Sequence, residues 1–454
     1  AMFDSTPRDV LFRYPLAYLL YIFHSVIQCK QNAVLGWKER LNELQLYYEQ
    51  TDGIEENYRS SILGETLIVK KFTHFNHFIE MTASDKEIIR LLKGQNSCIM
   101  LRSYIFTYGS PQYLYVYFRN AGSFRDLSDM LAKYVEFTRF SNGCGTGSDS
   151  LALAEYALET GDFDNVEQNC LRAMEKAETM SQISIIACAR FSLIRLRIIQ
   201  GRISEALGLL EQVQRDAEKI NLPFSNTTFD LCKGYIFASI CQPERIPSWL
   251  QTGDMMAASL YYQGIAYNYL VHGKAVMASK NYLKLEALTG QFEKAFSVFS
   301  NRLGFIHNLI FKAVSLCNLS GTSTGAAALE AALNEARIDN IIMPFVESAP
   351  HIIEMLQLFV RGKPGDKYAN RIFDLCRKYE RTIKEQSYHP VTLSQREIDI
   401  LSLTAEGLRR KEIAVRLYIS EETAKTHLKN IYQKLGASSK ISAVKIAQDR
   451  GYLE

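Results

Sequence analysis

Apolar residues recur at helical spacing along almost the whole of this 454-residue chain. Runs with the alternation typical of strands are scarce, and the best of them, residues 112–118 (QYLYVYF), is flanked by helical patterns. Only 10 residues are proline, so few helices would be broken. Since a period near 3.6 residues lines one face of a helix with apolar side chains, the sequence predicts an all-α fold.

A glycine-centred pattern recurs between residues 150 and 300. At Gly201, Gly273 and Gly290 an apolar residue follows the glycine by two positions and an alanine follows it by five, and Gly161 is a near match. We expect each glycine to end one helix in a left-handed cap, and each alanine to let the next helix pack closely. Such helical hairpins cannot bury their faces alone and must stack. The pattern resembles a tetratricopeptide (TPR) superhelix, with an irregular helical bundle as the alternative.

Changes in composition divide the chain into four expected segments. A Pro/Gly turn stands at residues 361–366, a polar, charged helix is predicted at 368–386, and residues 387–390 break it. The expected segments are an N-terminal helical region (1–149), a TPR-like repeat region (150–360), a charged helix and linker (361–392) and a small helical domain (393–454).

The formal net charge of +3 is distributed unevenly along the chain. Residues 1–360 hold 33 basic and 37 acidic residues, whereas residues 361–454 hold 19 basic and 12 acidic residues. This asymmetry indicates an anionic partner for the C-terminal end of the chain.

The C-terminal segment carries the start and stop signals of four short helices. Ser394 and Glu397 form a capping box that starts the first helix, and Gly407 ends it. The apolar stripe of this helix is expected to be Ile398, Leu401 and Ala405. The other helices are expected at residues 410–417, 420–435 and 439–449. Two short helices joined by a tight turn predict a helix-turn-helix.

The third of these helices has two different faces. Its inward face is expected to consist of Ala424, Leu428, Ile431 and Leu435, which recur at helical spacing. Its outward face is polar and has the reach to enter a DNA major groove, where lysines contact phosphates or guanine edges and a threonine offers its hydroxyl or methyl group. The outward residues are Glu422, Lys425, Thr426, Lys429 and Gln433.

This segment resembles the LuxR/GerE-type DNA-binding domain, through TLSQRE (392–397), KEIA (411–414), ISEET (419–423) and NIYQKL (430–435). The resemblance implies that the third helix reaches the major groove and that the start of the second lies near the DNA backbone. The predicted DNA-binding residues are Arg409, Arg410, Lys411, Glu422, Thr423, Lys425, Thr426, Lys429, Asn430 and Gln433. The fourth helix is the usual dimer contact of the family, which implies exposed dimer residues at Ile441, Val444, Lys445 and Gln448.

The rest of the chain is similar, less sharply, to the superhelical sensor region of large MalT-like LuxR regulators, as in GSPQYLY (109–115) and QPERIPSWL (242–250). The resemblance implies binding of an effector, a small molecule or a partner protein, whose identity and pocket stay open. A nucleotide-binding ATPase module precedes this region in the family, but the sequence contains no GxxxxGK[ST] motif. We expect either the C-terminal half of a longer regulator or a naturally short one.

No catalytic, cofactor or metal motif stands out, so neither an enzyme nor a cofactor is predicted. His74 and His77 would share one helix face without further His or Cys ligands, which favours packing over metal binding. The nine cysteines form no CxxC pair, which predicts a reduced, cytoplasmic protein. The apolar run at 16–27 is shorter than the roughly 20 residues that span a bilayer, so no membrane partner is expected.

Together these patterns predict a cytoplasmic, bacterial transcriptional regulator. A helical-repeat region would sense an effector or partner protein, and a helix-turn-helix would bind double-stranded promoter DNA as a homodimer. The alternative is a TPR-like protein-interaction scaffold with secondary DNA binding.

Overall fold

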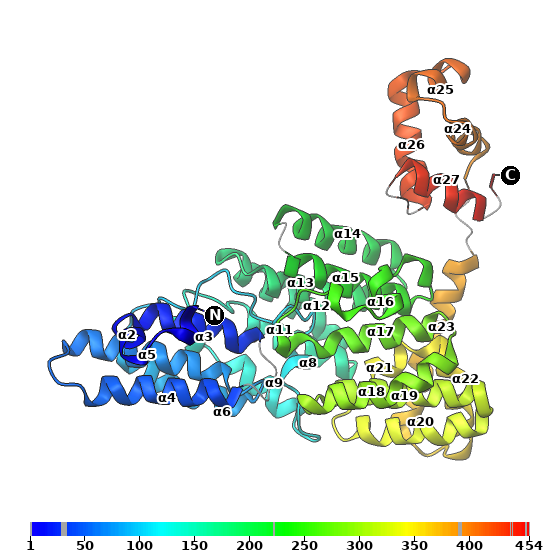
Figure 1. The fold of residues 1–454 in the computed structure, drawn as a ribbon. Helices are drawn as coiled ribbons and strands as arrows, with labels where there is room; N and C mark the ends of the chain where they lie inside the picture. Colours follow the sequence, from blue (N-terminus) through cyan, green and yellow to red (C-terminus); the bar gives the residue numbers. More distant parts are fainter. Residues whose placement is uncertain are drawn as a thin grey trace. The chain divides into compact units, whose positions relative to one another are not determined.

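The computed structural model describes residues 2–28, 34–220, 223–388, 393–435, 437, 439–449 and 452–453, and these form helices and turns without any strand (Figure 1). The prediction of an all-α fold is therefore confirmed. The chain divides into two compact units, residues 1–382 and residues 383–454.

The first part of the larger unit is built from helices of very different length. The apolar run at 16–27 lies in helix α3, which packs against α5. The helices are α1 (Met2–Ser5), α2 (Arg8–Arg13), α3 (Pro15–Gln28), α4 (Val34–Gln50), α5 (Glu56–Phe72), α6 (Phe78–Thr82), α7 (Asp85–Leu92), α8 (Tyr113–Tyr117), α9 (Phe124–Lys133) and α10 (Glu136–Phe140).

The strand-like run at 112–118 forms helix α8. All five of its side chains are buried, so their alternation does not mark an inner and an outer face. Glu155, from helix α11 (Ser148–Thr160), accepts hydrogen bonds from the backbone N–H groups of Tyr113 (2.8 Å) and Leu114 (2.7 Å). The start of α8 is thus capped by a residue about 40 positions away, which local sequence patterns do not reveal.

The remainder of the larger unit consists mainly of consecutive helices that pack against their neighbours in sequence, as in α11 with α12, α13 with α14 and α19 with α20 (Figure 1). These helices are α12 (Phe163–Thr179), α13 (Ile183–Ile199), α14 (Ile203–Ile220), α15 (Pro223–Ser239), α16 (Ser248–Thr252), α17 (Ala266–Ala278), α18 (Tyr282–Val298), α19 (Arg302–Ser320), α20 (Thr322–Arg337), α21 (Met343–Val346), α22 (Ala349–Gly362) and α23 (Lys367–Tyr388).

The glycine pattern predicts two of its four turns correctly. Gly161 and Gly201 have φ angles of +75° and +80° and stand between paired helices, as expected. Gly273 and Gly290, in contrast, lie inside α17 and α18, so the prediction of a turn at these two residues is wrong. A Cβ atom on Gly273 would lie 2.3 Å from the ring of Phe311, so the glycine there permits close approach of α19.

Charged groups lie inside the larger unit and hold several helices together. Arg195 of α13 pairs with Glu159 of α11 (2.8 Å) and with Glu347, next to α21 (2.7 Å), and all three side chains are at most 3% exposed. Tyr235 of α15 donates a hydrogen bond to Glu347 (2.6 Å). Buried charges are tolerated where they are paired and hydrogen-bonded.

Helix α19 is, within the described ranges, the one helix long and apolar enough to cross a membrane by length and composition. Of its apolar window, 56% is buried inside the protein, and α19 packs on α18 and α20. This burial is typical of a core helix.

His74 and His77 do not share a helix face, which corrects the prediction. They lie in the turn between α5 and α6, where Glu80 approaches His74 at 2.8 Å and His77 at 3.8 Å. Among the described residues no group of three or more His, Cys, Asp or Glu side chains is arranged to hold a metal ion, and the eight cysteines described are free.

The smaller unit contains four short helices around one apolar core. They are α24 (Gln395–Ala405), α25 (Arg410–Arg416), α26 (Glu421–Leu435) and α27 (Lys440–Asp449). The capping box of Ser394 and Glu397 is confirmed, since each residue's side chain bonds the other's backbone N–H. The predicted stripe of α24 is partly wrong. Leu401 is buried and Ile398 is half-buried, but Ala405 is exposed and Ile400, which was not predicted, is buried. The predicted polar helix forms α23, whereas residues 389–392 of the expected linker lie outside the described residues.

Candidate nucleic-acid interface

Helices α25 and α26 are joined by a tight turn of four residues, 417–420. The backbone N–H of Ile419 donates to the carbonyl oxygen of Ala414 (3.0 Å), and Tyr418 adopts a left-handed φ of +53°. Ser420 then caps α26, because its Oγ accepts the backbone N–H of Thr423 (3.0 Å). The two helices pack against each other across this turn. The arrangement is a helix-turn-helix.

The inward face of α26 anchors it in the core. Its four predicted inward residues are 0–6% exposed, which confirms the assignment. They meet Ile413 and Ala414 of α25 and Leu401 of α24 in the core of the smaller unit. The outward face of α26 is thereby fixed by packing from behind.

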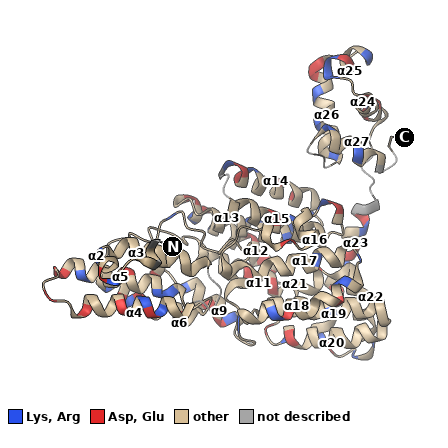
Figure 2. Ribbon diagram, viewed as in Figure 1, with Lys and Arg blue, Asp and Glu red and all other residues tan. Residues whose placement is uncertain are grey.

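All five predicted outward residues of α26 are exposed. Figure 2 marks the basic and acidic positions along the ribbon of this helix. Lys425 Nζ lies 3.0 Å from Glu422 Oε1, one helical turn earlier. Thr426 donates its hydroxyl to the carbonyl oxygen of Glu422 (2.9 Å), which leaves its methyl group and oxygen lone pairs for another partner. Exposed ion pairs of this kind are weak, so a phosphate can displace Glu422 from Lys425 at little cost.

The basic residues before α25 are also exposed. Arg409, Arg410 and Lys411 stand at the helix start, where Glu412 accepts the backbone N–H of Arg409 (2.6 Å). Burial raises the pKa of Tyr432 on α26, while the guanidinium of Arg410 acts in the opposite direction, which places Arg410 near α26. The predicted DNA-binding residues of α25 and α26 therefore lie on two helices that pack against each other.

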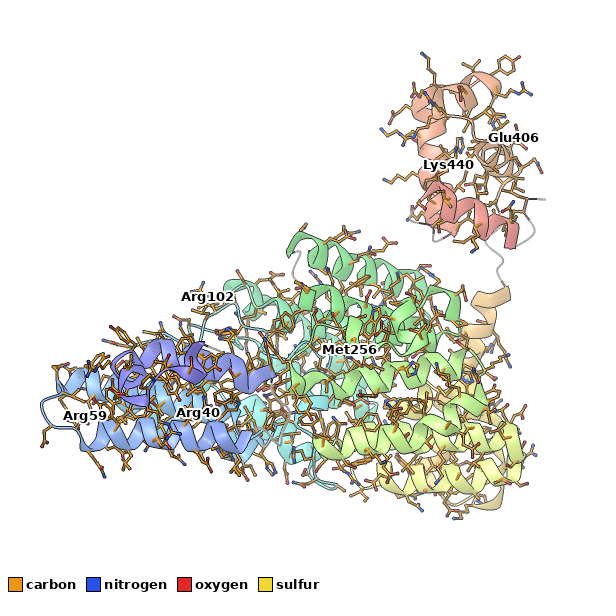
Figure 3. All side chains as sticks on the ribbon, viewed as in Figure 1. Arg40, Arg59, Arg102, Met256, Glu406 and Lys440 are labelled. Carbon is orange, nitrogen blue, oxygen red and sulfur yellow. The ribbon has the colours of Figure 1, made fainter. Side chains whose placement is uncertain are left out.

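The predicted dimer residues of α27 differ in exposure. Ile441 is 82% exposed, and Lys445 and Gln448 are also exposed. Val444 is half-buried and packs against the core, so its prediction as an exposed residue is wrong. Lys440, labelled in Figure 3, stands at the start of α27. Its ammonium group donates to the carbonyl oxygen of Leu408 at 3.4 Å.

Glu397 has a second role that the capping motif does not reveal. Lys434 of α26 forms an ion pair with it at 2.7 Å. Burial raises the pKa of the Glu397 carboxyl, but the hydrogen bonds from Lys434 and Ser394 outweigh this effect and keep it below its ordinary value. The pair therefore joins the start of α24 to the end of α26.

Two exposed apolar side chains near the turn were not singled out from the sequence. Tyr418 is 97% exposed and Val415 is 72% exposed. Both stand in the mainly apolar stretch 413–419, where the local sequence does not separate an exposed side chain from a buried one. A tyrosine hydroxyl is a common donor to DNA phosphates.

Comparison with known proteins agrees with this geometry. A family model described as bacterial regulatory proteins, luxR family (GerE), matches residues 391–447. The transcriptional regulatory protein YdfI of Bacillus subtilis is 41% identical over 76 residues, which cover 17% of this chain and 35% of YdfI. The nitrate/nitrite response regulator protein NarP of Escherichia coli is 34% identical over 122 residues, 26% of this chain and 54% of NarP.

One similarity extends well beyond the smaller unit. The HTH-type transcriptional regulator MalT of Serratia proteamaculans is 26% identical over 240 residues, which cover 45% of this chain. The match covers 26% of MalT, so the chain spans about a quarter of that relative's length. Residues 391–447 therefore carry a helix-turn-helix domain of the LuxR family of bacterial regulatory proteins, and the similarity of the chain to MalT reaches beyond this domain.

Proposed function

We propose that this chain is a bacterial, cytoplasmic transcriptional regulator that binds promoter DNA through α26. The observation that carries the proposal is the division of α26 into a buried face and a polar face whose side chains are all exposed. These polar side chains contribute nothing to the core. Helix α26 also follows a tight turn, as the recognition helix of a helix-turn-helix does.

The exposed side chains fit the chemistry of a DNA groove. Lys425 and Lys429 suit phosphates or guanine edges, and the amides of Asn430 and Gln433 suit adenine. Glu422, Thr423 and Thr426 lie on the first turns of α26, the part of a recognition helix that contacts bases. Arg409, Arg410 and Lys411 would hold the adjacent DNA backbone.

We further propose that two copies bind as a homodimer, with α27 as the contact through Ile441, Lys445 and Gln448. Two half-sites about one helical turn apart would suit such a pair. Residues 1–382 would act as the sensor of an effector or partner protein. No catalytic step forms part of this proposal.

The test is DNA binding by the full chain carrying Lys425→Ala and Lys429→Ala, on an operator selected from random duplexes. We expect affinity to fall at about 150 mM salt and the slope of log K against log salt to shrink by about 2, as two phosphate contacts are lost. The control is Lys86→Ala with Lys294→Ala, which removes the same charge from exposed positions of the larger unit. Equal binding by the α26 variant and the parent would contradict the proposed face.

The scaffold alternative is favoured by the length of the larger unit, which takes up residues 1–382. It predicts a stable protein partner and no selected operator. Enrichment of a specific duplex by the parent chain would exclude it as the main function.

A further inference from the structure

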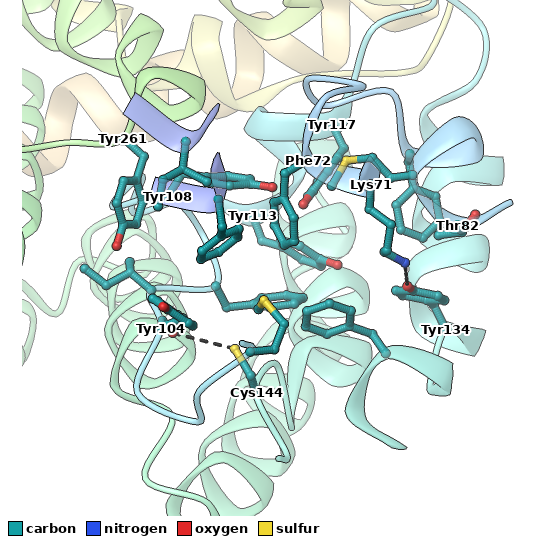
Figure 4. A pocket seen from close by; sticks show the side chains of 18 residues that line it. Lys71, Phe72, Thr82, Tyr104, Tyr108, Tyr113, Tyr117, Tyr134, Cys144 and Tyr261 are labelled. Carbon is teal, nitrogen blue, oxygen red and sulfur yellow. Dashed lines mark hydrogen bonds between the residues drawn. The ribbon is translucent and has the colours of Figure 1, made fainter. Parts of the chain in front are cut away.

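The larger unit contains a partly open cavity with a free volume of about 50 Å³, bounded by α3, α5, α6, α8 and α10 (Figure 4). Its walls are mostly aromatic and aliphatic, and they include the rings of Phe72 and Tyr113. Protein interiors are normally packed without voids larger than a water molecule. A mostly apolar cleft or cavity with a few polar groups is the usual form of a small-molecule site.

One side of the cavity carries a buried ion pair. Lys71 Nζ bonds Asp85, and both side chains are at most 4% exposed. Lys71 also donates to the hydroxyl of Tyr134 (3.1 Å), and that hydroxyl donates to Asp85. The lysine charge is therefore already balanced, and a charged ligand would leave an uncompensated charge in the interior.

Tyr104 and Tyr261 stand on the opposite side of the cavity (Figure 4). Burial raises the pKa of Tyr104 to about 12 and that of the Cys144 thiol to about 12. These groups therefore stay neutral near pH 7 and offer hydrogen bonds without charge. The cavity lining is therefore mostly apolar, its one ion pair carries no net charge, and hydrogen-bonding groups lie at two sides.

The volume that this cavity can offer a ligand depends on two flexible side chains. Met81 and Met100 belong to its wall, and methionine adapts readily to irregular space. The free volume alone is smaller than an aromatic ring needs, so these side chains must move for one ring to enter. A molecule much larger than one ring would disrupt the packing of α5 and α6.

We propose that this cavity binds a small, uncharged aromatic molecule that carries one hydroxyl or carbonyl group. Its ring would lie among the aromatic side chains, and its polar group would bond the hydroxyls of Tyr104 and Tyr261 or the ammonium of Lys71. Binding of this molecule does not depend on the proposed function. An effect of this binding on DNA affinity does rest on the proposed function.

The first experiment is calorimetric titration of the full chain, without DNA, with phenol, benzoate and cyclohexanol as probes. We expect saturable binding of phenol and at least tenfold weaker binding of benzoate, because its charge has no partner. Cyclohexanol should also bind more weakly, because it lacks the flat ring. Unsaturable binding of phenol, or tighter binding of benzoate, would overturn the proposal.

Two variants locate the probe. Cys144→Leu fills the cavity from a residue that is 1% exposed and should abolish phenol binding. The matched control is Cys98→Leu, at an exposed cysteine outside the lining. If Cys144→Leu does not fold, Tyr104→Phe, which removes only a hydroxyl, should weaken phenol binding about fivefold. Unchanged phenol affinity in every lining variant that folds would place the probe elsewhere and overturn the proposal.

The second experiment repeats the DNA titration at saturating phenol with the parent and Cys144→Leu chains. A change in DNA affinity of the parent alone supports the cavity as the effector site. Phenol binding with no change in DNA affinity overturns that role. If the chain binds no DNA at all, the proposed function fails, while the ligand site stands or falls on the first experiment.

Discussion

Lys274 lies fully buried in α17, with its ammonium group 4.3 Å from the centre of the Tyr235 ring. Its Nζ has no hydrogen-bond partner among the described residues. Burial lowers the pKa of Lys274 to about 8, although the carboxylate of Glu347 acts in the opposite direction. The charge is therefore costly near neutral pH.

Replacing Lys274 by methionine should change the pH dependence of stability. Between pH 8 and 10.5 the folded parent binds fewer protons than the unfolded chain, so its free energy of unfolding should rise with pH, by about 3 kcal/mol in total. Lys274→Met should lack this rise. Urea unfolding of both chains over this range measures it, and the difference cancels the titration of tyrosines and cysteines. Parallel pH profiles would show that Lys274 is solvated in the folded state.

At the scale of elements, two glycines of the repeat pattern differ in position, because one lies at the end of a helix and the other lies inside a helix. Gly201 has a left-handed φ between α13 and α14, and an added Cβ would meet nothing closer than Thr382 at 3.8 Å. Gly290 lies in the middle of α18 with open space around it. The same sequence pattern therefore has opposite backbone requirements at the two positions.

A matched pair of alanine substitutions tests this difference. Gly201→Ala should destabilise the larger unit by about 1 kcal/mol, because a Cβ atom disfavours the left-handed region. Gly290→Ala should stabilise it by about 0.5–1 kcal/mol, because alanine is the better helix former. Urea midpoints give both values. If Gly290→Ala destabilised the protein as much as Gly201→Ala, Gly290 would lie in a turn, as the repeat pattern predicts.

At the scale of the whole molecule, the two compact units differ in their spectroscopic probes. The chain contains two tryptophans, Trp37 and Trp249, and both lie in residues 1–382. Tryptophan fluorescence thus reports on the larger unit, whereas the far-ultraviolet circular dichroism reports on the helices of both. The finer division of residues 1–382 into two regions stays a prediction.

Leu401→Ala should lower the stability of the smaller unit alone. Leu401 is fully buried in that core, and such a truncation costs about 2–5 kcal/mol. We expect an earlier transition in circular dichroism at an unchanged fluorescence midpoint. Leu158→Ala, equally buried in α11, should instead move the fluorescence transition. A fluorescence shift with Leu401→Ala would show that the two units unfold as one.

The DNA-binding candidate was largely predictable because its signals are local. The cap at Ser394 and the inward residues Ala424 and Leu428 act over three or four positions, which a sequence displays directly. Val444 was misjudged because the same helical spacing fits an exposed dimer face and a core contact. Packing of α27 on its neighbours decides between them.

The sequence by itself determined that the chain is helical and that its end is a helix-turn-helix with one polar face. Helical periodicity and caps depend on neighbours one turn away, so they are readable without a structure. Only the tertiary structure decided that Gly273 meets Phe311 and that Lys274 is buried. It also brought Lys71, Tyr104 and Tyr261 around one cavity. These contacts join residues far apart in the chain. A helix that is buried on all sides also shows no periodic pattern of apolar residues in its sequence.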